Sequence, residues 1–233
     1  MDKLVEKVLR SYNTVIEELD SIRKRDPAAV SRGEIALLYS GFHAVLAYRA
    51  AHFLHVHGRY ISARMISQAA RFLTGIEIHP GAVIGKGLFI DHGSGVVIGE
   101  TSIIGDNCTM YQGVTLGGTG KDCGKRHPTI GNNVMIGAGA KVLGPITVGS
   151  GSKIAAGAVV LNDIPDNCTA VGIPARVVKC QNIKVEETDL DQIHIPDPVA
   201  QELCAMRIKL AELEKKLMKT IPVNREEDAD DNI

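Results

Sequence analysis

The chain has 233 residues, of which 45% are hydrophobic, and its formal net charge is -1. This composition is sufficient for a folded core, but the balanced charge, the absence of tryptophan and an aromatic content of 4% argue against nucleic-acid binding. The first residues form a charged, amphipathic pattern, and the chain contains no apolar run of about eighteen residues. We therefore expect a soluble, cytoplasmic protein without a membrane partner.

Cysteine usage indicates a reducing compartment. The chain has five cysteines, an odd number, and none of them form a C-x-x-C pair. This pattern argues against a disulfide framework and against a zinc site. We expect free thiols at Cys108, Cys123, Cys168, Cys180 and Cys204.

The first part of the chain, residues 1–75, is predicted to be a helical domain. Apolar residues recur at alternating spacings of three and four over residues 2–23, the stripe of an amphipathic helix. Two further helices are expected over residues 34–57 and 61–73. The histidines in this region lack the spacing of metal ligands, and we assign no chemistry to His43, His52, His55 and His57.

From Ile78 to Val177 the chain repeats every six residues. This period is typical of a parallel β-helix, in which short strands stack coil on coil and one aliphatic residue per strand fills the core. We expect the β-helix to span residues 76–180. Its inward residues are predicted to be Ile78, Ile84, Ile90, Ile98, Ile104, Met110, Leu116, Ile130, Ile136, Val142, Val148, Ile154 and Val160. The glycines that follow several of them are expected where φ is positive or where crowding excludes a Cβ, at Gly85, Gly99, Gly105, Gly131, Gly137 and Gly149.

The six-residue register is interrupted twice. The step from Ile90 to Ile98 takes eight residues and inserts two into a segment that contains His92. The step from Leu116 to Ile130 takes fourteen residues, which predicts a loop. Most of the candidate chemical groups lie in these two interruptions.

After the β-helix, residues 181–219 are predicted to form a linker and a helix that begins at Asp197-Pro198. The helix has a narrow apolar seam at heptad spacing, formed by Val199, Leu203, Met206, Leu210, Leu213 and Leu217. This seam either packs on the body of the same chain or forms a short parallel coiled coil at a threefold axis. The acidic residues 220–233 are expected to be disordered.

Three motifs resemble those of serine O-acetyltransferases: DHGSG at 91–95, VTLGGTGK at 114–121 and KRHP at 125–128. The resemblance runs from about Ile22 to Lys179, and it includes RDPA at 25–28, GFHA at 41–44 and GIPAR at 172–176. Hexapeptide repeats alone indicate only a broader acyltransferase superfamily. The family resemblance implies an α+β chain with a left-handed β-helix, a trimeric core and active sites in clefts between neighbouring subunits. Some family members form a dimer of trimers; the helical domain here is shorter than theirs, so a homotrimer and a dimer of trimers both stay open. The resemblance also implies acetyl-CoA as a co-substrate, with no permanently bound cofactor and no metal.

The resemblance assigns the general base to His92. An imidazole can remove the proton of the serine hydroxyl as the oxygen attacks the thioester, because an un-ionised alcohol is a weak nucleophile. Glu77 stands fifteen residues before His92, where the family commonly has an aspartate that orients the histidine. Since the substrate brings its own nucleophile, we expect direct transfer in a ternary complex and no acyl-enzyme.

Serine is a zwitterion, so its site needs both signs of charge. By resemblance, Asp26 and Asp91 bind the ammonium group, and Arg126 binds the carboxylate through its bidentate fork. His127 would be a second donor or a contact of the hydroxyl.

The resemblance also implies an acetyl-CoA site along the edge of the β-helix. Small residues there allow the pantetheine arm to lie against the backbone, and lysines meet the phosphates. A backbone N–H near Gly118 would stabilise the oxyanion. The implied residues are Gly118, Thr119, Ala138, Ala156, Lys141 and Lys153.

The chain ends at Ile233 after an acidic stretch. In the family that the motifs resemble, a C-terminal isoleucine inserts into the active site of cysteine synthase (O-acetylserine sulfhydrylase). A flexible tether with one apolar anchor and a terminal carboxylate suits capture in a site built for an amino acid. Cysteine synthase is therefore the expected protein partner.

Three other functions remain alternatives. A sugar or antibiotic O-acetyltransferase would use the same scaffold and a histidine base, but would not need charges for a zwitterion. A metal-dependent carbonic anhydrase with hexapeptide repeats needs three convergent histidines, and the repeat region has only His79, His92 and His127, without a closely spaced pair. A non-catalytic scaffold would leave the two interruptions unexplained.

Overall fold

The computed structural model describes residues 15–120 and 123–180, together with residues 203, 206–210, 212–214 and 216. The chain divides into two compact units, Met1–Pro196 and Asp197–Ile233. The finer division into four segments stays a prediction.

In the second unit, residues 206–210 and 212–214 are helical, in agreement with the predicted C-terminal helix. Its described seam residues are 55–62% exposed: Leu203, Met206, Leu210 and Leu213. The partner of the seam stays open between the two alternatives. The predicted linker and the acidic residues 220–233 lie outside the described residues.

Helices make up the start of the first unit. Residues 15–25 are helical, followed by α2 (Arg32–Leu38), α3 (Ser40–Val56) and α4 (Tyr60–Thr74). The prediction of one continuous helix over 34–57 is wrong at Tyr39, where φ of -85° and ψ of 106° are extended and separate α2 from α3. None of the helices in the described part of the chain is long and apolar enough to cross a membrane.

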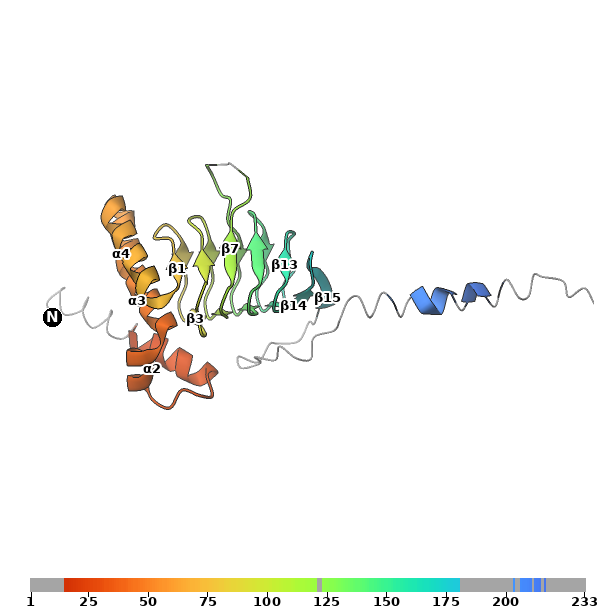
Figure 1. Ribbon diagram of the computed structural model, residues 1–233, viewed down its shortest axis with the longest axis horizontal. Helices are drawn as coiled ribbons and strands as arrows, with labels where there is room; N and C mark the ends of the chain where they lie inside the picture. Colours follow the sequence, from red (N-terminus) through yellow and green to blue (C-terminus); the bar gives the residue numbers. More distant parts are fainter. Residues whose placement is uncertain are drawn as a thin grey trace, which may run out of the picture. The chain divides into compact units, whose positions relative to one another are not determined.

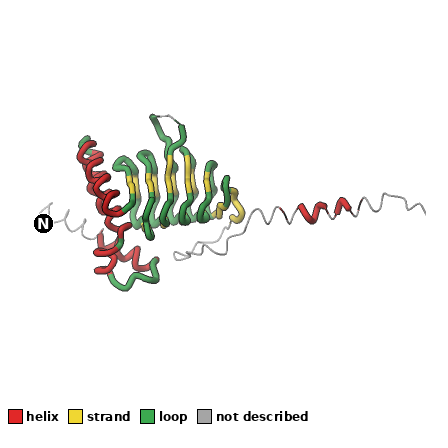
Figure 2. Tube along the Cα trace, viewed as in Figure 1, coloured by secondary structure: helices red, strands yellow, loops and turns green. Residues whose placement is uncertain are grey.

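The rest of the first unit is the predicted left-handed parallel β-helix (Figures 1 and 2). Its strands form three sheets, ordered β1-β4-β7-β10-β13, β11-β8-β5-β2 and β15-β14-β12-β9-β6-β3. All pairs are parallel except the terminal pair of β14 and β15, which is antiparallel. The strands are β1 (Glu77–Ile78), β2 (Val83–Ile84), β3 (Phe89–Ile90), β4 (Val97–Ile98), β5 (Ile103–Ile104), β6 (Thr109–Met110), β7 (Thr115–Gly117), β8 (Thr129–Ile130), β9 (Met135–Ile136), β10 (Lys141–Leu143), β11 (Thr147–Val148), β12 (Lys153–Ile154), β13 (Val159–Val160), β14 (Cys168–Val171) and β15 (Arg176–Cys180).

The core of the β-helix consists of the aliphatic residues that set its period. All of the residues predicted to point inward, from Ile78 to Val160, have an exposed fraction of 6% or less. Burial of each such side chain stabilises the fold by about 1.5–3 kcal/mol. The hexapeptide register is therefore confirmed as the origin of the core.

The glycines after these aliphatics are explained by crowding and not by backbone angle. None of the six predicted turn glycines is among the described residues with positive φ. Instead, a Cβ at Gly137 would lie 2.5 Å from the backbone nitrogen of Ala156 in the next coil. Such an approach is closer than packed atoms tolerate, so the stacking distance between coils requires glycine.

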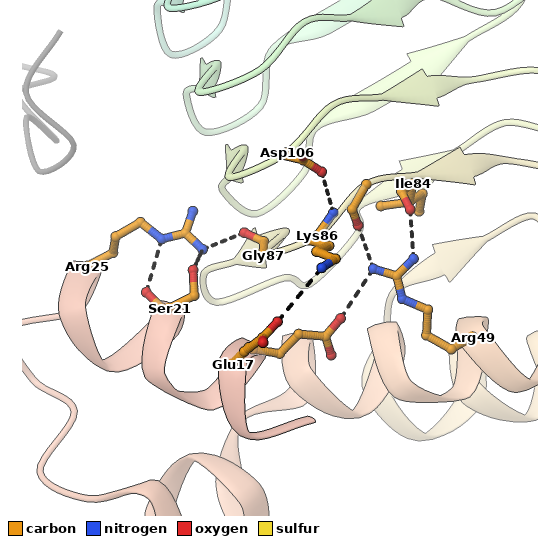
Figure 3. Close-up of polar contacts among 10 residues, drawn as sticks. Glu17, Ser21, Arg25, Arg49, Ile84, Lys86, Gly87 and Asp106 are labelled. Carbon is orange, nitrogen blue, oxygen red and sulfur yellow. Dashed lines mark hydrogen bonds and ion pairs between the residues drawn. The ribbon is translucent and has the colours of Figure 1, made fainter. Parts of the chain in front are cut away.

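Two arginines attach the helices to the first coils of the β-helix (Figure 3). Arg25 is buried, and its guanidinium donates to the carbonyls of Gly87 and Cys108. Arg49 of α3 donates to the carbonyl of Ile84 at 2.6 Å. Burial lowers the pKa of Arg25 to about 10, which leaves it charged at neutral pH. The charge is thus compensated by carbonyl dipoles, and the helix that carries it is fixed to the coil.

The prediction of five free thiols is wrong for two of them. Cys168 and Cys180 form a disulfide, because the antiparallel pairing of β14 with β15 places them directly opposite each other with a Cα–Cα distance of 4.1 Å. The two cysteines are twelve residues apart in the sequence, and this spacing does not predict the hairpin. Cys108 is buried and Cys123 is exposed, and both are free. Cys204 lies outside the described residues.

Candidate active site

The two interruptions of the repeat lie at different corners of the β-helix. One corner connects the sheet of β3 to the sheet of β1, and we call its residues 91–96, 111–114, 137–140 and 155–158 the His92 corner. The next corner connects the sheet of β1 to the sheet of β2, and we call its residues 79–82, 99–102 and 118–128 the Arg126 corner. The loop of this second corner projects from the body of the β-helix after β7 (Figure 1).

His92 has an unusual backbone. Its φ is 58°, in the left-handed region, and the other described non-glycine residues with positive φ are Asn107, Asn133 and Asn167. Asparagine tolerates this region, and histidine enters it more often than most residues, but at a cost of about 1–2 kcal/mol. The result is a side chain that is 76% exposed at the turn. A strained, projecting histidine is typical of a functional position.

One carboxylate lies beside His92, and a second lies near the first. Asp91 Oδ1 is 3.9 Å from Nε2 of His92. Burial raises the pKa of Asp91; His92 opposes this shift, and the charge of Asp26 adds to it. The structure therefore brings Asp26, Asp91 and His92 together at one corner.

Tyr39 completes this group. Its hydroxyl donates to Oδ2 of Asp26 at 2.6 Å. Burial, followed by the bond to Asp26, raises the pKa of the tyrosine well above its ordinary value. The sequence pattern places Tyr39 inside a continuous helix and gives no sign of this role, whereas in the structure it lies at the break between α2 and α3.

Glu77 lies next to the same corner, but its carboxylate contacts arginines of α4. It is 3.3 Å from Nε of Arg71 and 3.8 Å from Nη2 of Arg64. Its backbone nitrogen donates to the carbonyl of Val96, at the end of the His92 corner. The orientation of His92 by Glu77 stays a prediction.

Arg126 and His127 lie together at the Arg126 corner. Arg126 Nη2 donates to a carboxylate oxygen of Glu100. His127 is 9% exposed, and its ring lies so close to Gly99 that a Cβ there would be 2.0 Å from Cδ2. Burial lowers the pKa of His127, as does the charge of Arg126. The ring is therefore fixed and neutral at neutral pH.

The residues predicted for acetyl-CoA are divided between the corners. Ala138 and Ala156 belong to the His92 corner. Backbone hydrogen bonds of 2.8 Å join its successive coils: Gly113 donates to Ser94, Gly139 to Gln112 and Gly157 to Ala138. The two alanines lie on the same edge of the β-helix as His92.

Gly118 and Thr119 belong to the Arg126 corner. A Cβ on Gly118 would be 3.3 Å from Nε2 of His127, and one on Gly144 would be 3.1 Å from Oγ1 of Thr119. These two residues are therefore placed with Arg126 and not with His92.

The two predicted phosphate-binding lysines are both on strands. Lys141 of β10 donates to Oγ1 of Thr115 at 3.0 Å and to the carbonyl of Gly113. Lys153 is the first residue of β12. Lys141 is therefore held by the preceding coil, and the phosphate role of both lysines stays a prediction.

Each corner alone has only part of the predicted chemistry. The His92 corner has the base and the carboxylates, and the Arg126 corner has the guanidinium and the second imidazole. Within the described part of the chain, no group of three or more histidine, cysteine, aspartate or glutamate side chains converges as a metal site. Glu100 and Thr101, which no motif indicated, directly follow the crowded Gly99 and contact the Arg126-His127 pair.

The chain is similar to known proteins in sequence and in fold. Residues 127–162 match the family model described as bacterial transferase hexapeptide (six repeats). The serine acetyltransferase of Bacillus subtilis is 57% identical over 206 residues, which cover 88% of this chain and 94% of the relative. The chain belongs to the serine acetyltransferase family.

Solved structures of this family have the same fold. The serine acetyltransferase of Brucella abortus in complex with coenzyme A is 43% identical with a TM-score of 0.72, and the match covers 77% of this chain and 73% of that one. The Neisseria gonorrhoeae serine acetyltransferase in complex with serine is 43% identical with a TM-score of 0.71, over 73% of this chain and 70% of that one.

Proposed function

We propose that the protein transfers the acetyl group of acetyl-CoA to the hydroxyl of L-serine, giving O-acetylserine and CoA for cysteine biosynthesis in the cytoplasm. The observation that carries this proposal is the strained, exposed His92 beside Asp26 and Asp91. A base next to two carboxylates suits an acceptor that has both a hydroxyl and an ammonium group. The crystal structures of relatives with serine and with coenzyme A support both substrates.

In this mechanism His92 removes the proton of the serine hydroxyl as the oxygen attacks the thioester carbonyl. The tetrahedral intermediate then collapses, the C–S bond breaks, and the imidazolium returns the proton to the CoA thiolate. Asp26 and Asp91 hold the serine ammonium, so that the hydroxyl points toward the imidazole. Because the acceptor supplies the nucleophile, no covalent acyl-enzyme forms.

The remaining groups come from the other corner. Arg126 would bind the serine carboxylate, with His127 as a donor beside it and the N–H of Gly118 at the oxyanion. The Arg126 guanidinium donates to Glu100, so serine would compete with Glu100 for it. Since this group lies at a different corner from His92, we propose a homotrimer in which each active site joins the His92 corner of one subunit to the Arg126 corner of the next.

The acetyl-CoA arm would follow the edge that contains Ala138 and Ala156. Their small side chains leave the backbone of the corner accessible, and Ala156 is exposed. The phosphates would be met by Lys141 and Lys153, which requires Lys141 to leave Thr115.

We also propose that cysteine synthase binds the C-terminus through Ile233, which lies outside the described residues. Deletion of Ile233 should leave acetyl transfer unchanged and abolish the complex, as measured by calorimetry with purified cysteine synthase. Complex formation by the shortened chain would reject this mode of binding.

The proposed reaction is tested by thiol release from acetyl-CoA. We expect release with L-serine and little or none with homoserine or with a panel of sugars. Release that depends on a sugar and not on serine would instead indicate a related O-acetyltransferase of the same superfamily.

A further inference from the structure

The Arg126 corner is organised around a single threonine. Thr101 lies on the turn between β4 and β5, and its hydroxyl oxygen accepts hydrogen bonds from the backbone nitrogens of Arg126 and His127, both at 3.1 Å. Its carbonyl oxygen accepts from Nζ of Lys125 at 2.6 Å. Three consecutive residues of the long loop are therefore attached to one residue of the preceding coil.

Thr101 also determines the protonation of the His127 ring. Its backbone N–H donates to Nδ1 of His127 at 3.2 Å, and its hydroxyl lies 2.9 Å from the same nitrogen. A backbone N–H can only donate, so Nδ1 must be the unprotonated nitrogen. The single proton of the neutral ring is consequently on Nε2, the nitrogen that lies beside Gly118.

Burial and the charges around the ring favour the same state. Burial disfavours the imidazolium most, and Arg126 and Lys125 add to this effect, while Glu100 opposes it. His79, on the first turn of this corner, also interacts with the ring. The ring therefore stays neutral.

We propose that Thr101 is a positioning residue that fixes the Arg126-His127 pair and holds His127 as a neutral donor from Nε2–H. The inference rests on the proposed function, because the pair would bind the carboxylate and hydroxyl of serine. It assigns different roles to the two histidines of the site: His92 is exposed and accepts a proton, whereas His127 donates a hydrogen bond and does not act as a base.

The test replaces the hydroxyl by a methyl group of similar size. Thr101→Val leaves the N–H groups of residues 126 and 127 without their acceptor and removes one of the two donors to Nδ1. We expect KM for serine to rise at least about tenfold while KM for acetyl-CoA changes less than about twofold. Thr101→Ser keeps the hydroxyl and should restore the serine KM to within about threefold of the wild-type value.

A second readout is independent of activity. In long-range ¹H–¹⁵N spectra of histidine-labelled protein, with His127→Gln used to assign the signals, wild-type His127 should show the Nε2–H tautomer. In Thr101→Val, protonation of this ring should shift to higher pH, because Nδ1 loses the hydroxyl hydrogen bond that it accepts. Thr147→Val, at an exposed threonine of β11, is the matched control and should change neither readout.

Three results would decide the matter. An Nδ1–H tautomer in the wild-type protein would overturn the proposal, and so would an unchanged serine KM in Thr101→Val. If Thr101→Val does not fold, Thr101→Ala also removes the hydroxyl, without adding a methyl group, and supplies the same comparison. Failure of the wild-type protein to acetylate serine would overturn the proposed function alone, because the tautomer of His127 is still measured.

Discussion

At the scale of single residues, the backbone conformation of His92 explains how an interruption of the repeat presents the proposed base. The two residues inserted after Ile90 allow the chain to pass through left-handed φ at both His92 and Gly93. A Cβ on Gly93 would be 2.4 Å from Ile76, so only the first of these two positions can carry a side chain. The insertion therefore presents one histidine outward at a conformational cost of about 1–2 kcal/mol.

This cost predicts that stability and activity change in opposite directions. His92→Gly removes the base and the strain together. We expect turnover to fall by at least about 10². We expect a net rise of about 0.5–1 kcal/mol in the free energy of unfolding, because the relief of strain exceeds the entropy that glycine adds to the unfolded chain. Steady-state kinetics and urea unfolding measure the two effects. His57→Ala, at an exposed histidine at the end of α3, is the control, and retained turnover in His92→Gly would reject the general base.

A glycine in the stacked coils gives a second prediction. In Gly137→Ala the new methyl group would meet the backbone of Ala156 at 2.5 Å, which forces adjacent coils apart. We expect a loss of about 1–3 kcal/mol in the free energy of unfolding. Gly124→Ala is the matched control, because a Cβ at Gly124 meets no atom within 4 Å and should be nearly neutral. Equal stability of the two variants would show that the coil spacing is not what requires glycine.

At the scale of elements, the helix over residues 15–25 is coupled to the coil by Arg25. The guanidinium contacts the carbonyl of Gly87, just before β3 (Figure 3). It also donates to the hydroxyl of Thr109 in β6 at 3.0 Å. Strand β3 leads directly to Asp91, and Arg25 directly precedes Asp26. One buried side chain thus ties together the two segments that hold the carboxylates.

Substitution of this arginine should affect both stability and serine binding. In Arg25→Met the alkyl stem remains but the donors to Gly87 and Cys108 are lost. We expect the free energy of unfolding to fall by about 2–4 kcal/mol and KM for serine to rise, because Asp26 is no longer held near Asp91. Arg32→Met is the control, since Arg32 pairs with Asp20 on an exposed surface, where such pairs contribute little. A serine KM equal to that of the wild-type protein would show that Arg25 has a structural role only.

The elements also show what sequence can and cannot predict here. The inward residues from Ile78 to Val160 could be predicted because one physical constraint, burial at every sixth position, acts at each of them. The break at Tyr39 could not, because the local pattern is helical and the bond to Asp26 that accompanies the break is tertiary. The disulfide of Cys168 was missed for a similar reason, since it depends on the register of a hairpin. Most of the site residues could be predicted from motifs. Their division between two corners could not, because it follows from the topology of the coils.

At the scale of the whole molecule, the separation of the two corners means that, in the proposed homotrimer, a single chain holds only part of each active site. His92 follows β3 and Arg126 precedes β8, so the sheet of β1, β4, β7, β10 and β13 lies between their corners. In a cyclic trimer every subunit offers its His92 corner to one neighbour and its Arg126 corner to the other. Two subunits with different defects can therefore form one intact site between them.

This arrangement predicts complementation between inactive chains. His92→Ala and Arg126→Ala are each expected to be nearly inactive with serine. When they are co-expressed with different tags and mixed trimers are purified through both tags, one of the three interfaces joins an intact His92 corner to an intact Arg126 corner. The mixed trimers should then have about one third of the wild-type activity, measured by thiol release. Two differently tagged His92→Ala chains, purified in the same way, should show no recovery. Mixed trimers as inactive as their parents would place both corners of a site in the same subunit and would contradict the shared site.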